Sequence, residues 1–197
     1  MAETDEKTPR SRRVRAVTAK SLENAAVHYL QRFSASSANL RRVLLRRIER
    51  ARRAEAKVAP DAEAAIDAIV EKFQRLKLID DAAFAAGKAA ALRRRGSSRR
   101  TIGGKLRLAG IDGDGIETAI EAADAELAPT FDDEEGPNAE LRAAIRLAQR
   151  RRLGPFRAEK ERAERRQRDL ASLARAGFSL DIARQVIDAQ TPEALTD

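Results

Sequence analysis

Residues 106–120 read LRLAGIDGDGIETAI, and residues 173–187 read LARAGFSLDIARQVI. In both stretches a leucine is followed three residues later by Ala-Gly, then by an apolar residue, a capping turn and an apolar helix. Gly110 and Gly177 are suited to end a helix, because glycine adopts the left-handed backbone conformation without steric cost. The recurrence predicts the same junction between two helices twice in one chain, which indicates an internal repeat.

Helical periodicity extends outward from both junctions, since apolar residues recur at spacings of three and four. Asp80-Asp81 and Ser97-Ser98 supply side chains that can cap two helices before the first junction. A helix with an apolar face begins near Leu141, and a long charged helix leads to the second junction. The pattern predicts two units of three helices, at residues 80–128 and 139–191.

Residues 21–79 form a further unit, although they lack the junction glycine. Ser21 is the predicted N-cap of its first helix, whose apolar face extends to Phe33, and Pro60-Asp61 begins its last helix. The sequence therefore predicts an all-α fold of tandem three-helix repeats. Because each unit is too small to bury a large core, neighbouring units are expected to stack into an elongated, curved modular array.

Two segments fall outside the repeats. Residues 1–20 carry mixed charge and little apolar content, which predicts a disordered charged tail. Residues 129–138 contain Asp132-Asp133-Glu134-Glu135 followed by Gly-Pro, which predicts an acidic linker.

The composition of the 197 residues excludes several classes of protein. Aromatic residues make up 4%, and cysteine and tryptophan are absent. Disulfides, thiolate chemistry and cysteine zinc sites are thereby excluded. No apolar run approaches the roughly 20 residues that span a bilayer, and residues 1–20 lack the apolar stretch of a secretory signal. A soluble cytoplasmic protein without a membrane partner is expected.

Lysine and arginine total 39 against 31 acidic residues, a formal net charge of +8. The first of three basic clusters runs from Arg41 to Arg53 and contains one stripe at helical spacing: Arg42, Arg46, Arg50 and Arg53. The second cluster contains no acid and comprises Lys88, Arg93, Arg94, Arg95, Arg99, Arg100, Lys105 and Arg107. The third, from Arg146 to Arg168, is diluted by glutamates.

The first two clusters have few acids near them in the sequence, so an acidic partner is the simplest explanation for them. The alternative is that such a helix simply exposes its arginines to solvent and pairs them with acids one turn away. This explanation suits the third cluster better. Arginine binds phosphate and carboxylate through two parallel hydrogen bonds. Few aromatic residues accompany the clusters, so we expect non-specific, salt-dependent phosphate contacts and no base stacking. The candidate binding residues are Arg42, Arg46, Arg50, Arg53, Arg93, Arg94, Arg95, Arg99, Arg100 and Lys105.

No catalytic site is predicted. His28 is the only histidine, and a metal site or proton relay built on it would need partners that the chain lacks. Asp112-Gly113-Asp114-Gly115 lacks the glycine and glutamate of a calcium loop and is interpreted as a helix-capping turn. No glycine-rich phosphate-binding loop is present. We therefore expect a protein that binds a partner without catalysis, metal or cofactor.

Several motifs resemble those of the RecX family of bacterial recombination regulators. Leu78-Ile79-Asp80-Asp81, Phe84-Ala85 and Arg95-Gly96 match its central signature. The match continues through Arg100, Ile102, Lys105-Leu106 and Gly110-Ile111, and includes Leu153-Gly154-Pro155-Phe156 and Ala176-Gly177-Phe178-Ser179. The resemblance covers residues 21–190. The sequence departs from the family at residues 86–91, which are alanine-rich where aromatic residues are usual.

The resemblance implies a protein that binds RecA filaments on single-stranded DNA, and we expect it to be a monomer. It further implies inhibition of recombination, strand exchange and the coprotease activity of RecA. The alternative is an autonomous DNA-binding protein of helix-turn-helix type, such as a transcription regulator, because three-helix units with a basic helix also suit that role. Sequence-specific readers mix polar residues on the recognition helix, whereas these stripes are nearly pure arginine.

Overall fold

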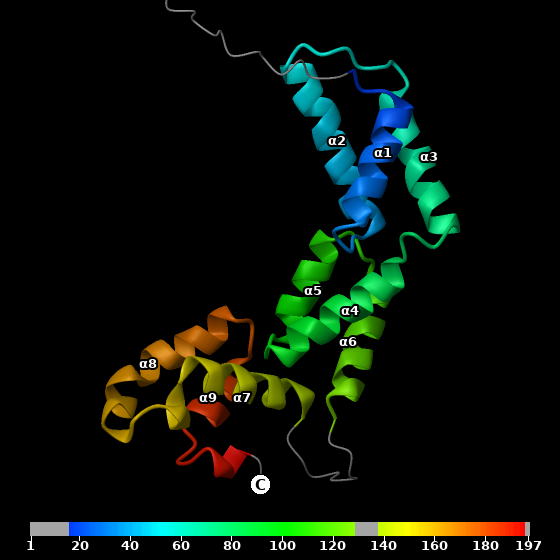
Figure 1. Ribbon diagram of the computed structural model, residues 1–197. Coiled ribbons are helices and arrows are strands. Elements are labelled where there is room, and N and C mark those ends of the chain that lie inside the picture. Colours follow the sequence, from blue (N-terminus) through cyan, green and yellow to red (C-terminus); the bar gives the residue numbers. More distant parts are fainter. Residues whose placement is uncertain (1–15, 129–137, 196–197) are drawn as a thin grey trace, which may run out of the picture. The chain divides into compact units, whose positions relative to one another are not determined.

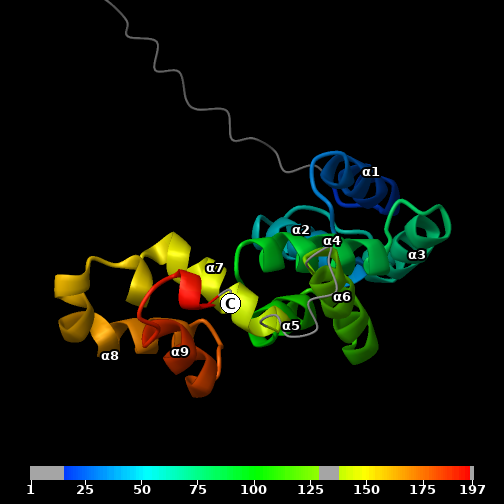
Figure 2. The same cartoon turned by 90° about the horizontal axis from the view of Figure 1, so that it is seen from below.

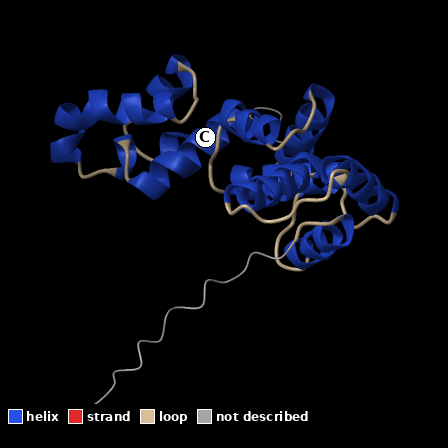
Figure 3. Ribbon diagram, turned by 90° about the horizontal axis from the view of Figure 1, so that it is seen from above, coloured by secondary structure: helices blue, strands red, loops and turns tan. Residues whose placement is uncertain are grey.

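The computed structural model describes residues 16–128 and 138–195. Across these two ranges every regular element is a helix (Figure 3). The prediction of an all-α fold is confirmed. The chain divides into two compact units between Ile79 and Asp80.

The first unit packs three helices around one apolar core, with α3 against both α1 and α2 (Figure 1). These helices are α1 (Ala19–Leu30), α2 (Ser37–Arg53) and α3 (Ala62–Arg75). Ser36 caps α2 by accepting a hydrogen bond from the backbone N–H of Asn39 at 3.2 Å. The apolar residues of each helix share one face, which packs into a core that includes Leu22, Leu40, Leu44, Ile48, Ile66 and Phe73.

The predicted boundary of the tail at residue 20 is wrong for the residues that the structure describes. Val17 is buried, and its backbone N–H donates to the carbonyl oxygen of Lys57 at 2.9 Å. Thr18, not Ser21, is the N-cap of α1, and the two side chains form a reciprocal capping box. A buried apolar residue before the cap therefore moves the start of the unit toward the N-terminus.

The described residues of the second unit form six α-helices in two groups of three. In the first group α4 packs along α6, with α5 against both (Figure 1). In the second, α9 packs against α7 and α8 (Figure 2). The helices are α4 (Asp81–Arg94), α5 (Arg99–Leu108), α6 (Gly113–Glu126), α7 (Ala139–Arg151), α8 (Glu159–Arg175) and α9 (Leu180–Ile187), with short 3₁₀ helices η1 (Gly154–Phe156) and η2 (Glu193–Leu195).

The helix ends lie where the predicted glycines and capping side chains place them. Gly110 and Gly177 follow α5 and α8 with positive φ angles of 82° and 92°. Asp80, Ser98 and Ser179 accept capping hydrogen bonds from backbone N–H groups at the starts of α4, α5 and α9. Local sequence signals therefore fix where these helices begin and end.

The two groups of the second unit are joined by close backbone approach and hydrogen bonds. A Cβ atom on Gly96 would lie 2.7 Å from the carbonyl oxygen of Ala143 and from the backbone nitrogen of Leu147. Ser98 and Thr101 donate side-chain hydrogen bonds to the carbonyl oxygen of Ala176 at 2.6 and 2.8 Å. The start of α5 is thus anchored to the turn between α8 and α9.

Candidate nucleic-acid interface

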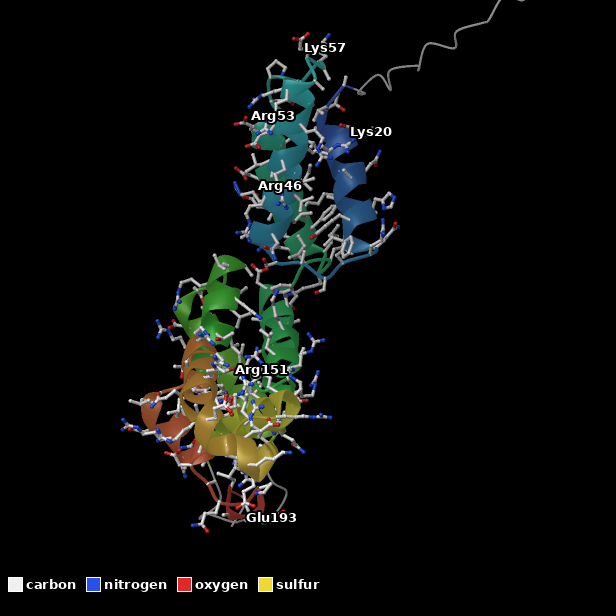
Figure 4. All side chains as sticks on the ribbon, turned by 90° about the vertical axis from the view of Figure 1, so that its left-hand side faces the viewer. Lys20, Arg46, Arg53, Lys57, Arg151 and Glu193 are labelled. Carbon is white, nitrogen blue, oxygen red and sulfur yellow. The ribbon has the colours of Figure 1, made fainter. Side chains whose placement is uncertain are left out.

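The α2 stripe, defined as Arg42, Arg46, Arg50 and Arg53, lies on the exposed side of α2. The helix buries Leu40, Leu44 and Ile48 against α1 and α3, which leaves the positions between them facing solvent. Arg46 and Arg53 follow one another along this helix (Figure 4). The stripe that the spacing predicts is therefore a continuous surface of the folded unit.

Neutralisation of the first cluster is confined to its margins. Arg41 pairs with Asp67, and Arg52 pairs with Glu63 at 2.7 Å, so both are held by α3 or its start. Within the stripe, Arg53 lies 4.0 Å from Glu49, and Arg42 donates to the side chain of Asn39.

Arg46 and Arg50 form the centre of the stripe. Neither makes a hydrogen bond or an ion pair with any residue that the structure describes. Their side chains are exposed, so water and salt are their partners in the free protein. Together with the neighbouring Arg47, this centre retains unneutralised charge.

A groove of about 670 Å³ lies beside this centre, between α1 and α2. Apolar side chains and the arginine guanidinium groups share its walls, and no acidic residue lines it. The lining residues are Ala25, His28, Tyr29, Arg32, Phe33, Val43, Leu44, Arg46, Arg47 and Arg50. The ring centroids of Tyr29 and Phe33 are 5.1 Å apart, with 37° between the ring planes.

The expectation that aromatic residues do not accompany the cationic clusters is wrong for this region. Phe33, which the apolar periodicity of the first helix placed in the core, lies in the turn after α1 and is half exposed. The fold brings it and Tyr29 to the same groove as Arg46. The sequence alone does not predict this arrangement, because the aromatic and basic residues belong to different helices.

The second cluster is more strongly neutralised than the first. Arg93, a predicted binding residue, is the clearest case in which the prediction is wrong. Its side chain is fully buried, donates to Asp124 and Glu140 at 2.6 Å each, and donates to the carbonyl oxygen of Ser97 at 2.9 Å. Burial opposes the charged form, but the hydrogen bonds to the two carboxylates outweigh it and raise the pKa of Arg93. Arg93 therefore cannot contact a partner in the folded protein.

Two more members of this cluster are paired with acids of α6. Arg94 lies 2.8 Å from Glu126, and Arg99 lies 3.0 Å from Asp124 and also pairs with Glu117. The expectation that the cluster is poorly neutralised is wrong for these residues as well. The candidates that stay exposed, with no ion pair among the described residues, are Arg95, Arg100 and Lys105.

The burial of Arg93 affects its neighbours in α7. Burial lowers the pKa of Arg146, and the positive charges of Arg93 and Arg142 lower it further. The carboxylate of Glu140 offsets part of this positive charge, since it pairs with Arg93. It also accepts a hydrogen bond from the backbone N–H of Arg99. The charges at this junction hold the two halves of the unit together.

Part of the third cluster is paired within the unit. Arg157 lies 3.1 Å from the buried carboxylate of Asp169, which raises the pKa of Arg157. Arg166 forms two hydrogen bonds with Asp188, at 2.7 and 2.6 Å. Arg162 donates to the backbone carbonyl groups of Arg157, Pro155 and Gln190.

The described residues contain no group of three or more histidine, cysteine, aspartate or glutamate side chains that could hold a metal ion. His28 lines the groove of the first unit, where it lies among arginines and apolar residues. In the part of the chain that the structure describes, no helix is both long enough and apolar enough to cross a bilayer.

Known proteins resemble this chain in sequence and in fold, although no protein-family model matches it. It is 43% identical over 178 residues to the regulatory protein RecX of Myxococcus xanthus, with 90% of this chain and 89% of that protein covered. It is 29% identical over 172 residues to the regulatory protein RecX of Agrobacterium fabrum, with 87% and 84% covered.

The fold agrees with this relationship. The crystal structure of a regulatory protein RecX superposes with a TM-score of 0.55 at 19% identity, over 87% of this chain and 72% of that chain. The similarity to the Myxococcus protein extends over about nine tenths of both sequences. The chain therefore belongs to the RecX family of regulatory proteins.

Proposed function

We propose that this protein is a negative regulator of the RecA recombinase that binds RecA filaments on single-stranded DNA. It inhibits recombination, strand exchange and the coprotease activity of RecA. It acts in the cytoplasm as a monomer, by binding alone. The relationship to regulatory proteins named RecX supports the partner, and the uncompensated charge of Arg46 and Arg50 supports the mode of binding.

The centre of the α2 stripe carries the proposal because its charge has no structural role in the free protein. Two exposed arginines one helical turn apart repel each other and gain little from a neighbouring helix. Phosphate groups on the filament neutralise them and release counterions, which favours binding at low salt. By contrast, the buried or paired arginines of the second unit already contribute to its stability.

The test is strand exchange and ATP hydrolysis by RecA on single-stranded DNA, with the full protein added at near-stoichiometric amounts. We expect inhibition by the natural sequence and at least tenfold weaker inhibition by the double variant Arg46→Glu/Arg50→Glu. Arg41→Glu/Arg52→Glu is the matched control, because it changes the net charge equally on the same helix but at residues paired with α3 or its start.

Absence of inhibition by the natural sequence would refute the proposal. Equal loss in both double variants would show that only net charge matters. The alternative, a sequence-specific DNA-binding protein, is separated by competition among a single strand, a random duplex and duplex libraries at two salt concentrations. Selection of one duplex sequence would favour that alternative, since base-edge contacts discriminate between sequences and phosphate contacts do not.

A further inference from the structure

We propose that the groove between α1 and α2 binds one nucleotide of single-stranded DNA, with its base stacked on the Tyr29–Phe33 pair and its phosphate held by Arg46 and Arg50. The site deepens the function proposed above and rests on it for the identity of the strand. It assigns a base contact where the sequence predicted phosphate contacts alone.

The groove has the size and the lining that a nucleotide needs. Its volume of about 670 Å³ falls within the range of roughly 300–1,000 Å³ that is typical of small-molecule sites. Ala25, Val43 and Leu44 provide an apolar wall, and the arginines stand on the side of α2. A planar apolar base and a charged phosphate therefore each meet a matching surface.

The aromatic pair provides the platform for the base. Phe33 is 50% exposed, and Tyr29 supports it from the last turn of α1. The guanidinium group of Arg32 lies 5.4 Å from the centroid of the Phe33 ring. Bases of single strands stack on aromatic rings and on arginine guanidinium planes, so both planar groups offer a stacking surface.

The arginines provide the phosphate contact. Arg46 and Arg50 are four residues apart on α2, which places their Cβ atoms about 6 Å apart on one side of the helix. Both line the groove together with Arg32 and Arg47, and no acidic side chain among the lining residues competes for them. A phosphate that enters the groove exchanges water for charge-assisted hydrogen bonds.

A nucleotide fits these observations better than an acidic peptide does. An amphipathic peptide helix needs large apolar anchors over at least two turns, and Phe33 is the one large hydrophobic side chain among the groove-lining residues that is half exposed. Carboxylates would neutralise the arginines and leave the stacking platform unused. A nucleotide uses both features with one rigid ligand.

The chain contains a single tyrosine and no tryptophan, so its tyrosine fluorescence reports on Tyr29 alone. The experiment titrates the full protein, without RecA, with oligo(dT) and with an abasic strand of equal length and charge. We expect saturable quenching of the tyrosine by oligo(dT) and none by the abasic strand. Affinity for the abasic strand, measured by anisotropy, should be about tenfold weaker, because the stacking of one base raises the affinity by a factor of about ten.

Variants separate the two parts of the site. Phe33→Leu keeps an apolar side chain but removes the ring, so it should bind both strands with nearly equal affinity, whereas Phe33→Trp should restore the preference for bases. Phe84→Leu is the matched control in the second unit, because Phe84 also lies against a cation, with the Lys88 Nζ 5.1 Å from its ring centroid. It should leave the preference for bases unchanged.

Three results would overturn the proposal: equal affinity of the natural sequence for both strands, quenching that Arg46→Glu/Arg50→Glu leaves intact, or displacement of oligo(dT) by polyglutamate at equal charge. The last result would assign the groove to an acidic peptide. Quenching without inhibition of RecA would support the site and refute the proposed function. Inhibition without quenching would do the reverse.

Discussion

The first and second basic clusters look alike in the sequence, but the central arginines of the first stay exposed whereas several arginines of the second are buried or paired. On α2, Arg46 and Arg50 stay exposed and unpaired among the described residues. On α4 and α5, Arg93 is buried and Arg99 is paired with α6. The acids that decide this are remote in sequence, at 31 and 47 residues from Arg93. Local charge density alone therefore cannot separate a binding surface from a structural ion pair.

The largest loss of stability that follows from this comparison is expected for Arg93→Met. The substitution leaves the carboxylates of Asp124 and Glu140 partly buried without their main partner, and removing one member of such a network costs about 3 kcal/mol. Urea unfolding of the full protein measures the loss. Arg95→Met, on the exposed side of the same turn, should change the stability by less than about 0.5 kcal/mol. Similar effects of the two substitutions would contradict the structural role of Arg93.

Gly96→Ala tests the backbone packing beside that ion pair. The added Cβ atom would lie 2.7 Å from backbone atoms of α7, and the residue has a positive φ of 74°, so we expect a loss of about 2 kcal/mol. Gly87→Ala is the matched control within α4. Its Cβ atom would meet nothing within 4 Å, and alanine should stabilise the helix by about 0.5–1 kcal/mol. Thermal unfolding that ranks the two variants otherwise would refute this packing.

The first cluster should respond to substitution in binding and not in stability. Arg46→Gln/Arg50→Gln should leave the unfolding free energy within about 0.5 kcal/mol of the natural value. Its affinity for single-stranded DNA should depend less on salt, with the slope of log K against log salt reduced by about 1.4, since each phosphate contact contributes about 0.7. Anisotropy titrations at several salt concentrations measure the slope. An unchanged slope would exclude these arginines from the interface.

The smallest effect is expected at the exposed pair of the third cluster. Hydrogen bonds from Arg166 lower the pKa of Asp188 below its unfolded value, which is about 3.9. The pair therefore adds stability above pH of about 4, and this contribution disappears as the pH falls through the lower pKa of the folded state. Because both side chains are exposed, the contribution is small. A carboxyl NMR titration should show a higher pKa for Asp188 in Arg166→Gln.

Much of the fold could be predicted because its signals are local. The caps at Asp80, Ser98 and Ser179 and the glycines after α5 and α8 act within a few residues of themselves. The site was less predictable, because its chemistry depends on which helices meet. Arg93 could not be recognised as buried without knowing that α4 lies against α6 and close to the start of α7.

The groove illustrates the same limit. Periodicity placed Phe33 on the inner face of the first helix, but α1 ends at Leu30 and the ring turns toward solvent. Because the helix ends one turn before Phe33, helical periodicity no longer predicts which way that side chain faces. The absence of further apolar residues at helical spacing after Phe33 was the only available signal, and it is a weak one.

The ion pairs of Arg93 also constrain the order in which the chain can fold as it leaves the ribosome. The first unit has its complete core by Ile79 and can fold as soon as those residues emerge. The helices α4 to α6 have their own apolar core by Ala123, but two of their polar contacts form later, because Glu140, which pairs with Arg93, and the Ala176 carbonyl that receives Ser98 are synthesised after them. Synthesis from the N-terminus therefore presents the finished α2 stripe to the cell while the second unit is still incomplete.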